Sequence, residues 1–156
     1  MPASDTAPDV RWTVHCDGTS QPNPGRMGLG AVFTAPDGAR HTLSKATGTN
    51  GCNNEAEVRA LIAALHELQR LGASEVRIYC DSSILVEQLG DAAAAPIVRL
   101  ANIFEEARQL LHRFPVAEMR WVPRHRNIEA DALARAALGL PSKAGMKVRP
   151  KKRYAR

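Results

Sequence analysis

The chain has 156 residues, of which 44% are hydrophobic and 24% are charged. This composition suffices for one domain with its own core and excludes a wholly disordered chain. It contains no apolar run of about 18 residues that could span a membrane, and its first ten residues carry acids and prolines where a secretory signal has basic and then apolar residues. We therefore expect a cytoplasmic protein without membrane contact, and a monomer, because no exposed apolar helix argues for a dimer.

The net charge of +5 is distributed unevenly along the chain. The segment Lys143–Arg156 holds seven of the 21 basic residues and no acid, so the part before it carries more acids than bases. We expect residues 141–156 to form a basic tail. Such a tail is either a solvated end without a partner or an arm that contacts nucleic acid phosphates.

Apolar periodicity and turn residues divide the chain into nine elements after a disordered lead-in at 1–10. In chain order we predict strands at 11–17, 28–35 and 40–48, a helix at 55–71, a strand at 75–81, helices at 82–89 and 97–112, a strand at 116–122 and a helix at 128–138. The first three strands form an antiparallel meander. The order β-β-β-α-β-α-α-β-α predicts one α/β domain at 11–140, with a mixed five-stranded sheet and helices on both faces.

Two of the predicted strands end in the same way, one on Cys16 and Asp17 and the other on Cys80 and Asp81. If these strands lie side by side and parallel, both carboxylates emerge at the carboxyl edge of one sheet, where open α/β sheets bind ligands. These two cysteines and Cys52 fit neither a disulfide framework nor a zinc pattern. The two on strands lie on the apolar side, which favours small buried hydrophobic side chains.

Two further acids lie where the apolar pattern places the core. Glu57 is four residues before Leu61 on the inward stripe of the long helix, and Asp131 lies in the alanine- and leucine-rich last helix. Each acid alone could cap a helix or form a salt bridge. Gathered with Asp17 and Asp81, however, they would raise one another's pKa unless cations neutralised them. Hard divalent cations such as Mg²⁺ bind carboxylate oxygens and substrate phosphates, so this set indicates metal-dependent phosphoryl chemistry.

At these positions the chain resembles type 1 ribonuclease H, the family that cuts the RNA strand of RNA/DNA hybrids. The resembling segments are CDGTSQPNPGRMGLGAVF from residue 16, NNEAE from residue 53, DS from residue 81, and VPR from residue 122 with Asn127, Asp131 and the following Leu-Ala. They span roughly residues 11–139 in the family's order. One such segment is weak evidence, whereas four in register with the expected elements are specific.

The resemblance implies a role for each matching residue. The implied catalytic and metal-binding residues are Asp17, Glu57, Asp81 and Asp131, which would hold two Mg²⁺, or Mn²⁺ as a substitute. In the family the ions activate a water for in-line attack, leaving 5′-phosphate and 3′-hydroxyl ends. The implied substrate-binding residues are Gly18, Asn23, Asn53, Asn54, Ser83 and Asn127. The asparagines at 23, 53 and 54 match positions that contact the hybrid's minor groove, where only RNA offers a 2′-hydroxyl. Alternatively, the first is a turn residue and one of the others caps a helix.

The chain departs from the family pattern in three places. The loop before Asp131 is short, and His125 within it is either an auxiliary residue for proton handling or product release, or an ordinary surface histidine. Ser83 stands where the family often has glutamine, which shortens the reach to substrate. Residues 90–96 contain no base where many members carry a basic protrusion that grips the DNA strand. We therefore expect the tail Lys143–Arg156 to supply part of the affinity for substrate.

These residues also distinguish between the proposed activity and other functions of a similar fold. A non-catalytic module that binds hybrids or other nucleic acids is the main alternative, and it predicts the loss of a carboxylate, whereas all four are present. A proofreading-type 3′ exonuclease needs Asp-x-Glu on the first strand, but Thr19 follows two residues after Asp17. We therefore expect an endonuclease that hydrolyses the RNA strand of RNA/DNA hybrids.

Overall fold

The structure is a computed structural model of the chain and describes residues 10–90 and 95–142. Most of the expected lead-in and the basic segment Lys143–Arg156 lie outside the described residues. Residues 91–94, in the segment that lacks a basic protrusion, lie outside them as well. No helix in the described part of the chain is long and apolar enough to cross a membrane.

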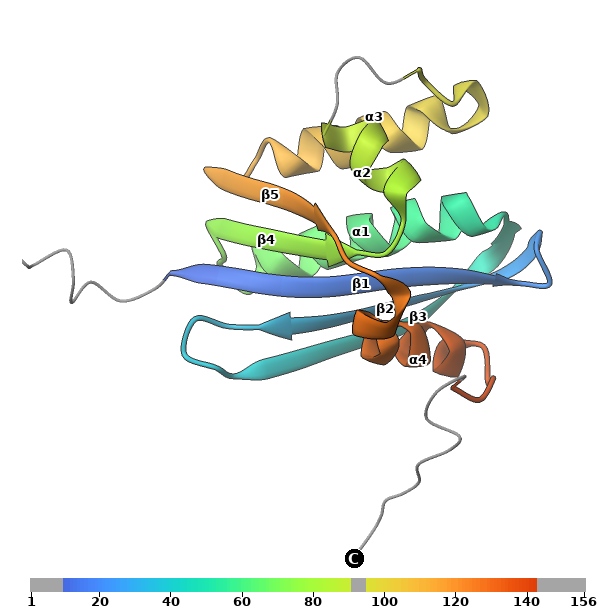
Figure 1. Cartoon of the computed structure of the whole chain (residues 1–156), viewed down its shortest axis with the longest axis horizontal. Coiled ribbons are helices and arrows are strands. Elements are labelled where there is room, and N and C mark those ends of the chain that lie inside the picture. Colours follow the sequence, from blue (N-terminus) through green and yellow to red (C-terminus); the bar gives the residue numbers. More distant parts are fainter. Residues whose placement is uncertain (1–9, 91–94, 143–156) are drawn as a thin grey trace, which may run out of the picture.

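The fold is a five-stranded mixed sheet with the strand order β3-β2-β1-β4-β5 and helices on both faces, as Figure 1 shows. Its elements are β1 (Arg11–Gln21), β2 (Gly25–Thr34), β3 (Arg40–Gly51), α1 (Asn53–Arg70), β4 (Glu75–Cys80), α2 (Ser83–Gly90), the 3₁₀ helix η2 (Val98–Leu100), α3 (Ala101–Leu111), β5 (Val116–Trp121), the 3₁₀ helix η3 (Arg124–Arg126) and α4 (Ile128–Ala137). The predicted α/β architecture and the order of its helices and strands are confirmed.

Strand β1 lies at the centre of the sheet and pairs differently on its two sides. It is antiparallel to β2, with Asp17 opposite Gly30, and parallel to β4, with His15 beside Tyr79. Asp81 follows the end of β4 and is two residues after Tyr79, just as Asp17 is two residues after His15. The two strands that end in Cys-Asp are therefore neighbours and parallel, as predicted, and they bring both carboxylates to one edge of the sheet.

The prediction that β1 ends at Asp17 was wrong. The strand continues to Gln21, which lies opposite Arg26 of β2. The turn-forming residues stay in the sheet because β2 runs beside them and satisfies their backbone groups on one side. Only the pairing with β4 stops before the acid. Strand β3 likewise extends past the predicted end at residue 48 to Gly51.

The core lies between the sheet and helices α1, α2 and α3, and α4 covers part of the other face (Figure 1). Cys16 and Cys80 are buried in this core, which confirms their expected packing role. Two glycines let helices approach the sheet closely. A Cβ at Gly18 would overlap the Ala56 carbonyl of α1, and a Cβ at Gly30 would overlap the Ala130 carbonyl of α4. These contacts place each helix's acid close to β1.

Candidate active site

The structure brings the four acids singled out from the sequence into one open pocket at the carboxyl edge of β1 and β4. Asp17 comes from β1, Glu57 from the second turn of α1, Asp81 from the residue after β4 and Asp131 from the first turn of α4. The residues that line the pocket are Asp17, Gly18, Thr19, Gln21, Asn53, Glu57, Asp81, Arg124 and Asp131. Four elements far apart in the chain therefore contribute to one polar site.

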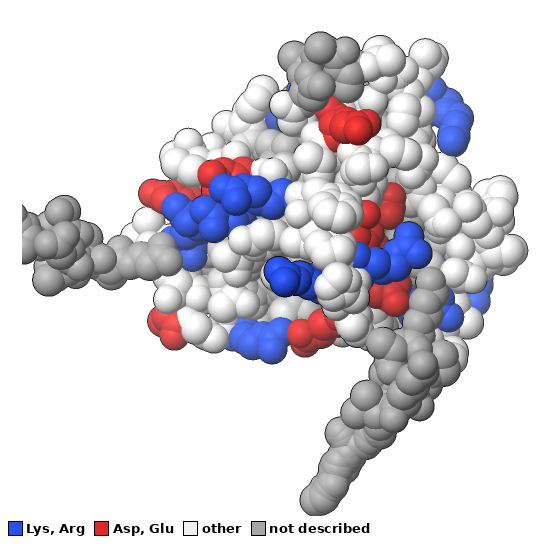
Figure 2. Space-filling view, in the orientation of Figure 1, with Lys and Arg blue, Asp and Glu red and all other residues white. Residues whose placement is uncertain are grey.

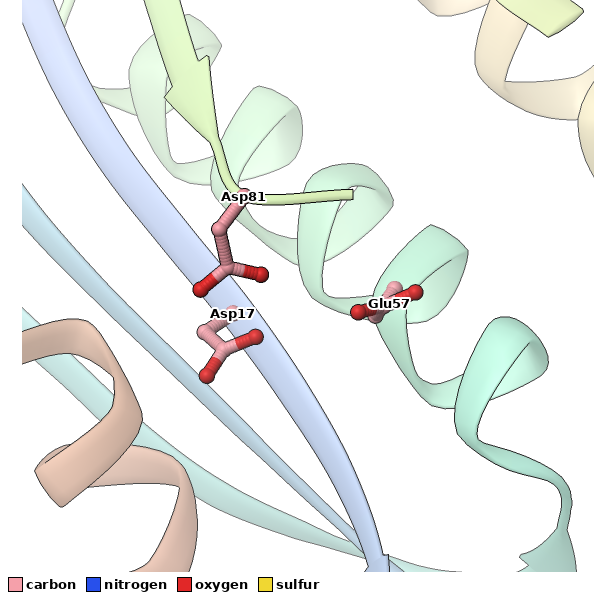
Figure 3. A group of neighbouring side chains, drawn as sticks. All are labelled: Asp17, Glu57 and Asp81. Carbon is pink, nitrogen blue, oxygen red and sulfur yellow. The ribbon is translucent and has the colours of Figure 1, made fainter. Parts of the chain in front are cut away.

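Three of the acids can act together as ligands. Each of Asp17, Glu57 and Asp81 has a carboxylate oxygen within 4.8 Å of the others. Figure 3 shows Asp17 on β1 next to Asp81, which follows the end of β4, with Glu57 across from them on α1. Asp131 lines the same pocket and is close enough to Asp17 to share a hydrogen bond with it. A set made only of carboxylate oxygens suits hard cations such as Mg²⁺ or Mn²⁺ rather than zinc.

The electrostatics of the pocket show an excess of negative charge. Burial, followed by the charges of Asp81 and Asp131, raises the pKa of Asp17 well above its ordinary value. Burial also raises the pKa of Glu57 to about 7, although a hydrogen bond from Ser82 opposes the shift. Because neighbouring carboxylates make ionisation of Asp17 and Glu57 less favourable, a bound cation would relieve this repulsion. The donor set and its charge therefore both fit a divalent metal.

Asn127 lies behind the carboxylates rather than on the surface of the pocket. Its side chain is 1% exposed, and its Nδ2 donates to the Cys16 carbonyl at 3.0 Å and to Asp81 Oδ2 at 3.3 Å. Its backbone carbonyl accepts a hydrogen bond from the amide of Asp131. This residue was expected to contact substrate, but its burial and its contacts make it a support that holds Asp81 against β1.

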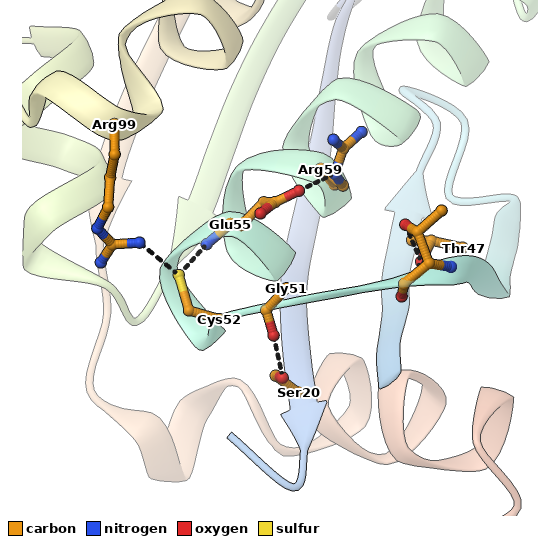
Figure 4. Close-up of polar contacts among 8 residues, drawn as sticks. Ser20, Thr47, Gly51, Cys52, Glu55, Arg59 and Arg99 are labelled. Atoms are coloured by element: carbon orange, nitrogen blue, oxygen red, sulfur yellow. Dashed lines mark hydrogen bonds and ion pairs between the residues drawn. The ribbon is translucent and has the colours of Figure 1, made fainter. Parts of the chain in front are cut away.

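The asparagines expected to contact substrate form a small network beside the pocket. Asn53 Oδ1 accepts from the Ser20 amide at 2.8 Å, and the Asn53 amide donates to Asn23 Oδ1 at 3.1 Å. Ser20 Oγ in turn donates to the Gly51 carbonyl (Figure 4). Asn54 is half-buried at the start of α1. The turn that follows β1 is therefore fixed to the N-terminus of α1, with Asn53 on the pocket wall.

The cap of α1 differs from the two alternatives considered from the sequence. The N-cap is Cys52, whose Sγ accepts from the Glu55 amide at 3.5 Å and from Arg99 Nη1 at 3.3 Å, as Figure 4 shows. The helix begins at Asn53, so neither Asn53 nor Asn54 is the cap. Cys52 is half-buried. Burial is the largest single effect on the pKa of its thiol and raises it, but the contacts with Arg99 and with backbone amides together outweigh burial, so the pKa is lowered.

The remaining predicted residues, Ser83 and His125, are not among the described residues that line the pocket. Ser83 is exposed at the start of α2, whereas the neighbouring Ser82 is buried and accepts from the Leu85 amide at 3.1 Å. His125 is exposed in η3 and is not among the residues lining the pocket, but Arg124 beside it is. Arg124 lowers the pKa of Glu57 by its charge. Sequence reasoning missed Arg124 as a site residue, although its place in the VPR segment was a signal.

The fold and the carboxylate pocket together define a ribonuclease H-like domain. Residues 15–137 match the family described as reverse transcriptase-like. Over 133 residues the chain is 36% identical to ribonuclease HI of Halobacterium salinarum, covering 84% of this chain and 67% of that protein. The chain belongs to the type 1 ribonuclease H family.

Other relatives agree with this assignment. The bifunctional protein Rv2228c of Mycobacterium tuberculosis is 37% identical over 130 residues, which cover 83% of this chain and 36% of that protein, so the chain spans about a third of its length. Among solved structures, ribonuclease H1 of Halobacterium salinarum superposes with a TM-score of 0.78 at 35% identity, covering 83% of this chain and 98% of that one. LC11-RNase H1 in complex with an RNA/DNA hybrid has a TM-score of 0.74 at 30% identity, covering 82% and 96%.

Proposed function

We propose that this chain hydrolyses the RNA strand of RNA/DNA hybrids, leaving 5′-phosphate and 3′-hydroxyl ends. The observation that carries the proposal is the convergence of Asp17, Glu57, Asp81 and Asp131 in one open pocket. It is supported by relatives named ribonuclease H and by the similar LC11 enzyme, whose structure holds an RNA/DNA hybrid. A binding module without catalysis would have no need to gather four carboxylates in a pocket where the pKa values of Asp17 and Glu57 are raised.

The cofactor we propose is Mg²⁺, as two ions, with Mn²⁺ as a substitute. Asp17, Glu57 and Asp81 would hold the metal, and Asp131 would complete the set from the side of α4. When bound, the ions supply Lewis-acid activation of water and stabilise charge that develops at the phosphate. The protein's part is to hold the carboxylates in position, with Asn127 supporting Asp81 and Ser82 donating to Glu57.

Recognition of the hybrid would take place beside the carboxylates. Gly18, Asn53 and Gln21 line the pocket wall, and Asn23 is hydrogen-bonded to the backbone of Asn53. This arrangement fixes amide groups in place before substrate binds, so less conformational entropy is lost on binding. We propose that these residues, together with Asn54, contact the minor groove of the hybrid, where a 2′-hydroxyl distinguishes RNA from DNA.

The basic tail Lys143–Arg156 is proposed to add nonspecific affinity for phosphates. The test is a truncation after Ser142. It keeps two hydrogen bonds to backbone carbonyls near the end of the described chain, from Arg26 to Leu138 and from Arg135 to Pro141. Counterion release gives a slope of about −0.9 per neutralised phosphate in log affinity against log salt on duplexes. We expect this truncation to flatten the slope by several units, and an unchanged slope would exclude the tail as a phosphate contact.

We also propose that the domain acts as a cytoplasmic monomer. Sedimentation at several concentrations tests its oligomeric state, and a mass that doubles with concentration would contradict the proposal. Imaging of the chain tagged in its own cells tests its location.

The proposed activity is tested by cleavage of a strand-labelled RNA/DNA hybrid with Mg²⁺ and, separately, with Mn²⁺. Matched RNA/RNA and DNA/DNA duplexes and the variant Asp81→Asn serve as controls. We expect cutting only in the RNA strand of the hybrid, and none by the variant. Binding of the hybrid without cutting in either metal would instead support a non-catalytic module.

A further inference from the structure

One half of the sheet has a face that no described helix covers. Helix α4 packs on β1, β2 and β3, and not to a comparable extent on β4 or β5, whereas α1, α2 and α3 lie on the opposite face. Figure 1 shows α4 over the β2–β3 side, with β4 and β5 beside it uncovered. We call the uncovered surface of β1, β4 and β5 on the α4 side the open face.

Cross-strand register defines which side chains share the open face. His15 lies beside Tyr79, which lies beside Arg120, and two residues further along Thr13 lies beside Arg77. Asp17 has the same parity on β1 as His15, so it points to the same side of the sheet. The rows of the open face therefore begin next to the carboxylate pocket and continue away from it at intervals of about 7 Å.

The open face carries more positive than negative charge. Its arginines, with those at its α4 border, are Arg11, Arg40, Arg77, Arg120 and Arg126, and its acids are Glu75, Glu118 and Glu129. Glu118 lies 2.8 Å from Arg77 and 3.5 Å from Arg120, so two guanidinium groups share one carboxylate. Figure 2 shows Lys and Arg side chains gathered over the β4–β5 half of this surface.

Two aromatic rings lie at the centre of the open face. The rings of His15 and Tyr79 stack with centroids 4.8 Å apart at an interplanar angle of 22°. The positive charge of the open face comes from its arginines. Guanidinium groups bind phosphates through two parallel hydrogen bonds, which suits a sugar-phosphate backbone better than a lysine surface would.

The segment between β5 and α4 joins this surface to the carboxylate pocket. Arg124 lines the pocket that holds the acids, whereas Arg126, two residues later, lines a separate hollow with His15 and Arg40. A phosphate chain that leaves the carboxylate pocket past Arg124 would therefore meet Arg126 next. Beyond it lie Arg120 and Arg77.

We propose that the open face is a second nucleic-acid contact surface, which binds the single strand that continues from the hybrid beyond the cleavage site. This inference rests on the proposed function, since it takes the strand to enter from the carboxylate pocket. Its ligand is a phosphodiester backbone, which RNA and DNA flanks share. Continuity with the pocket favours a nucleic acid over an acidic protein as the partner.

The test compares a short blunt hybrid with the same hybrid carrying a single-stranded flank, made of RNA or of DNA in separate arms. Binding is measured in EDTA over a range of salt concentrations. The double variant Arg120→Ala/Arg126→Ala removes two exposed charges from the open face. Counterion release on single strands contributes about 0.7 to the salt slope per phosphate, so we expect the flank-dependent slope to fall by about 1.4 and affinity at 0.1 M salt to fall about fivefold per arginine.

The matched control is Arg70→Ala/Arg113→Ala, which removes two exposed arginines, one at the C-terminus of α1 and one two residues after α3. We expect it to keep the gain in affinity that the flank provides. Glu118→Gln should change binding in the opposite direction, because it frees Arg77 and Arg120 from their shared carboxylate. A change in the RNA arm alone, in the DNA arm alone or in both identifies which flank is bound.

Two results would overturn the inference. One is a flank that gives wild type no gain in affinity, and the other is a gain that the Arg120→Ala/Arg126→Ala variant retains as fully as the control does. Either result would leave the open face to a protein partner. Cleavage of the blunt hybrid by wild type is scored separately. If that cleavage is absent, the proposed function fails whatever the flanks do.

Discussion

Replacing Glu57 by glutamine should stabilise the metal-free protein at alkaline pH while abolishing metal-dependent hydrolysis. Burial raises the pKa of Glu57 from 4.5 to about 7. Since the unfolded chain releases this proton near 4.5 and the folded chain near 7, the free energy of unfolding falls as pH rises through that window. This rise in the pKa of Glu57 corresponds to a loss of about 3 kcal/mol in the free energy of unfolding above pH 7. A neutral amide of the same shape would avoid that loss.

The assay is urea unfolding in EDTA at a pH below 4.5 and again above 7. We expect wild type and Glu57→Gln to have similar stability at the lower pH, and the variant to be more stable by up to about 3 kcal/mol at the higher one. Adding Mg²⁺ at the higher pH should stabilise wild type more than the variant, since a ligand that binds only the folded state raises its stability. Glu87→Gln, at an exposed position on α2, is the control. A gain in the Glu57 variant that is absent, or equal at both pH values, would refute the raised pKa of Glu57.

Further substitutions test how the pocket is supported. Asn127→Ala removes the donor to Asp81 and should lower metal affinity by about ten- to a hundredfold, measured by Mn²⁺ titration, with a loss of stability of about 1–3 kcal/mol; unchanged Mn²⁺ affinity would contradict the supporting role. Gly30→Ala forces a Cβ against the Ala130 carbonyl and should cost about 1–3 kcal/mol or more in urea unfolding. Gly90→Ala meets no atom of the described residues within 4 Å and should change stability by less than about 0.5 kcal/mol. Equal effects of the two alanines would refute the close approach of α4.

The proximity of Asp17 and Asp81 was predictable because it depends on two local features of the sequence. Alternation of apolar residues identifies each strand, and the shared Cys-Asp ending marks the position of each acid. The positions of Glu57 and Asp131 followed from acids on apolar helical stripes. Their arrival in one pocket also needs glycines at 18 and 30, and what those glycines contact is decided by helices that lie far away in the chain.

The errors arose where a distant partner overrode a local preference. The turn formers after Asp17 predict that the strand ends, but β2 continues beside them and keeps them in the sheet to Gln21. The sequence pattern equally favours Asn53 or Asn54 as a cap, whereas tertiary contacts give that position to Cys52. Asn127 was predicted to contact substrate because the family resemblance carries no information on burial, whereas the structure buries it.

The early end of β4 leaves part of one edge of β1 without a neighbouring strand, and asparagine side chains occupy it. The Cys16 carbonyl and the Ser20 amide lie at positions of the same parity, so they face the same edge, away from β2. Asn127 Nδ2 donates to the Cys16 carbonyl, and Asn53 Oδ1 accepts from the Ser20 amide. An asparagine amide carries the same donor and acceptor groups as a peptide bond. These two side chains therefore make the hydrogen bonds that a neighbouring strand would make to this part of β1. They block the pairing of a β-strand from another molecule at this edge, which is a route to aggregation at exposed sheet edges.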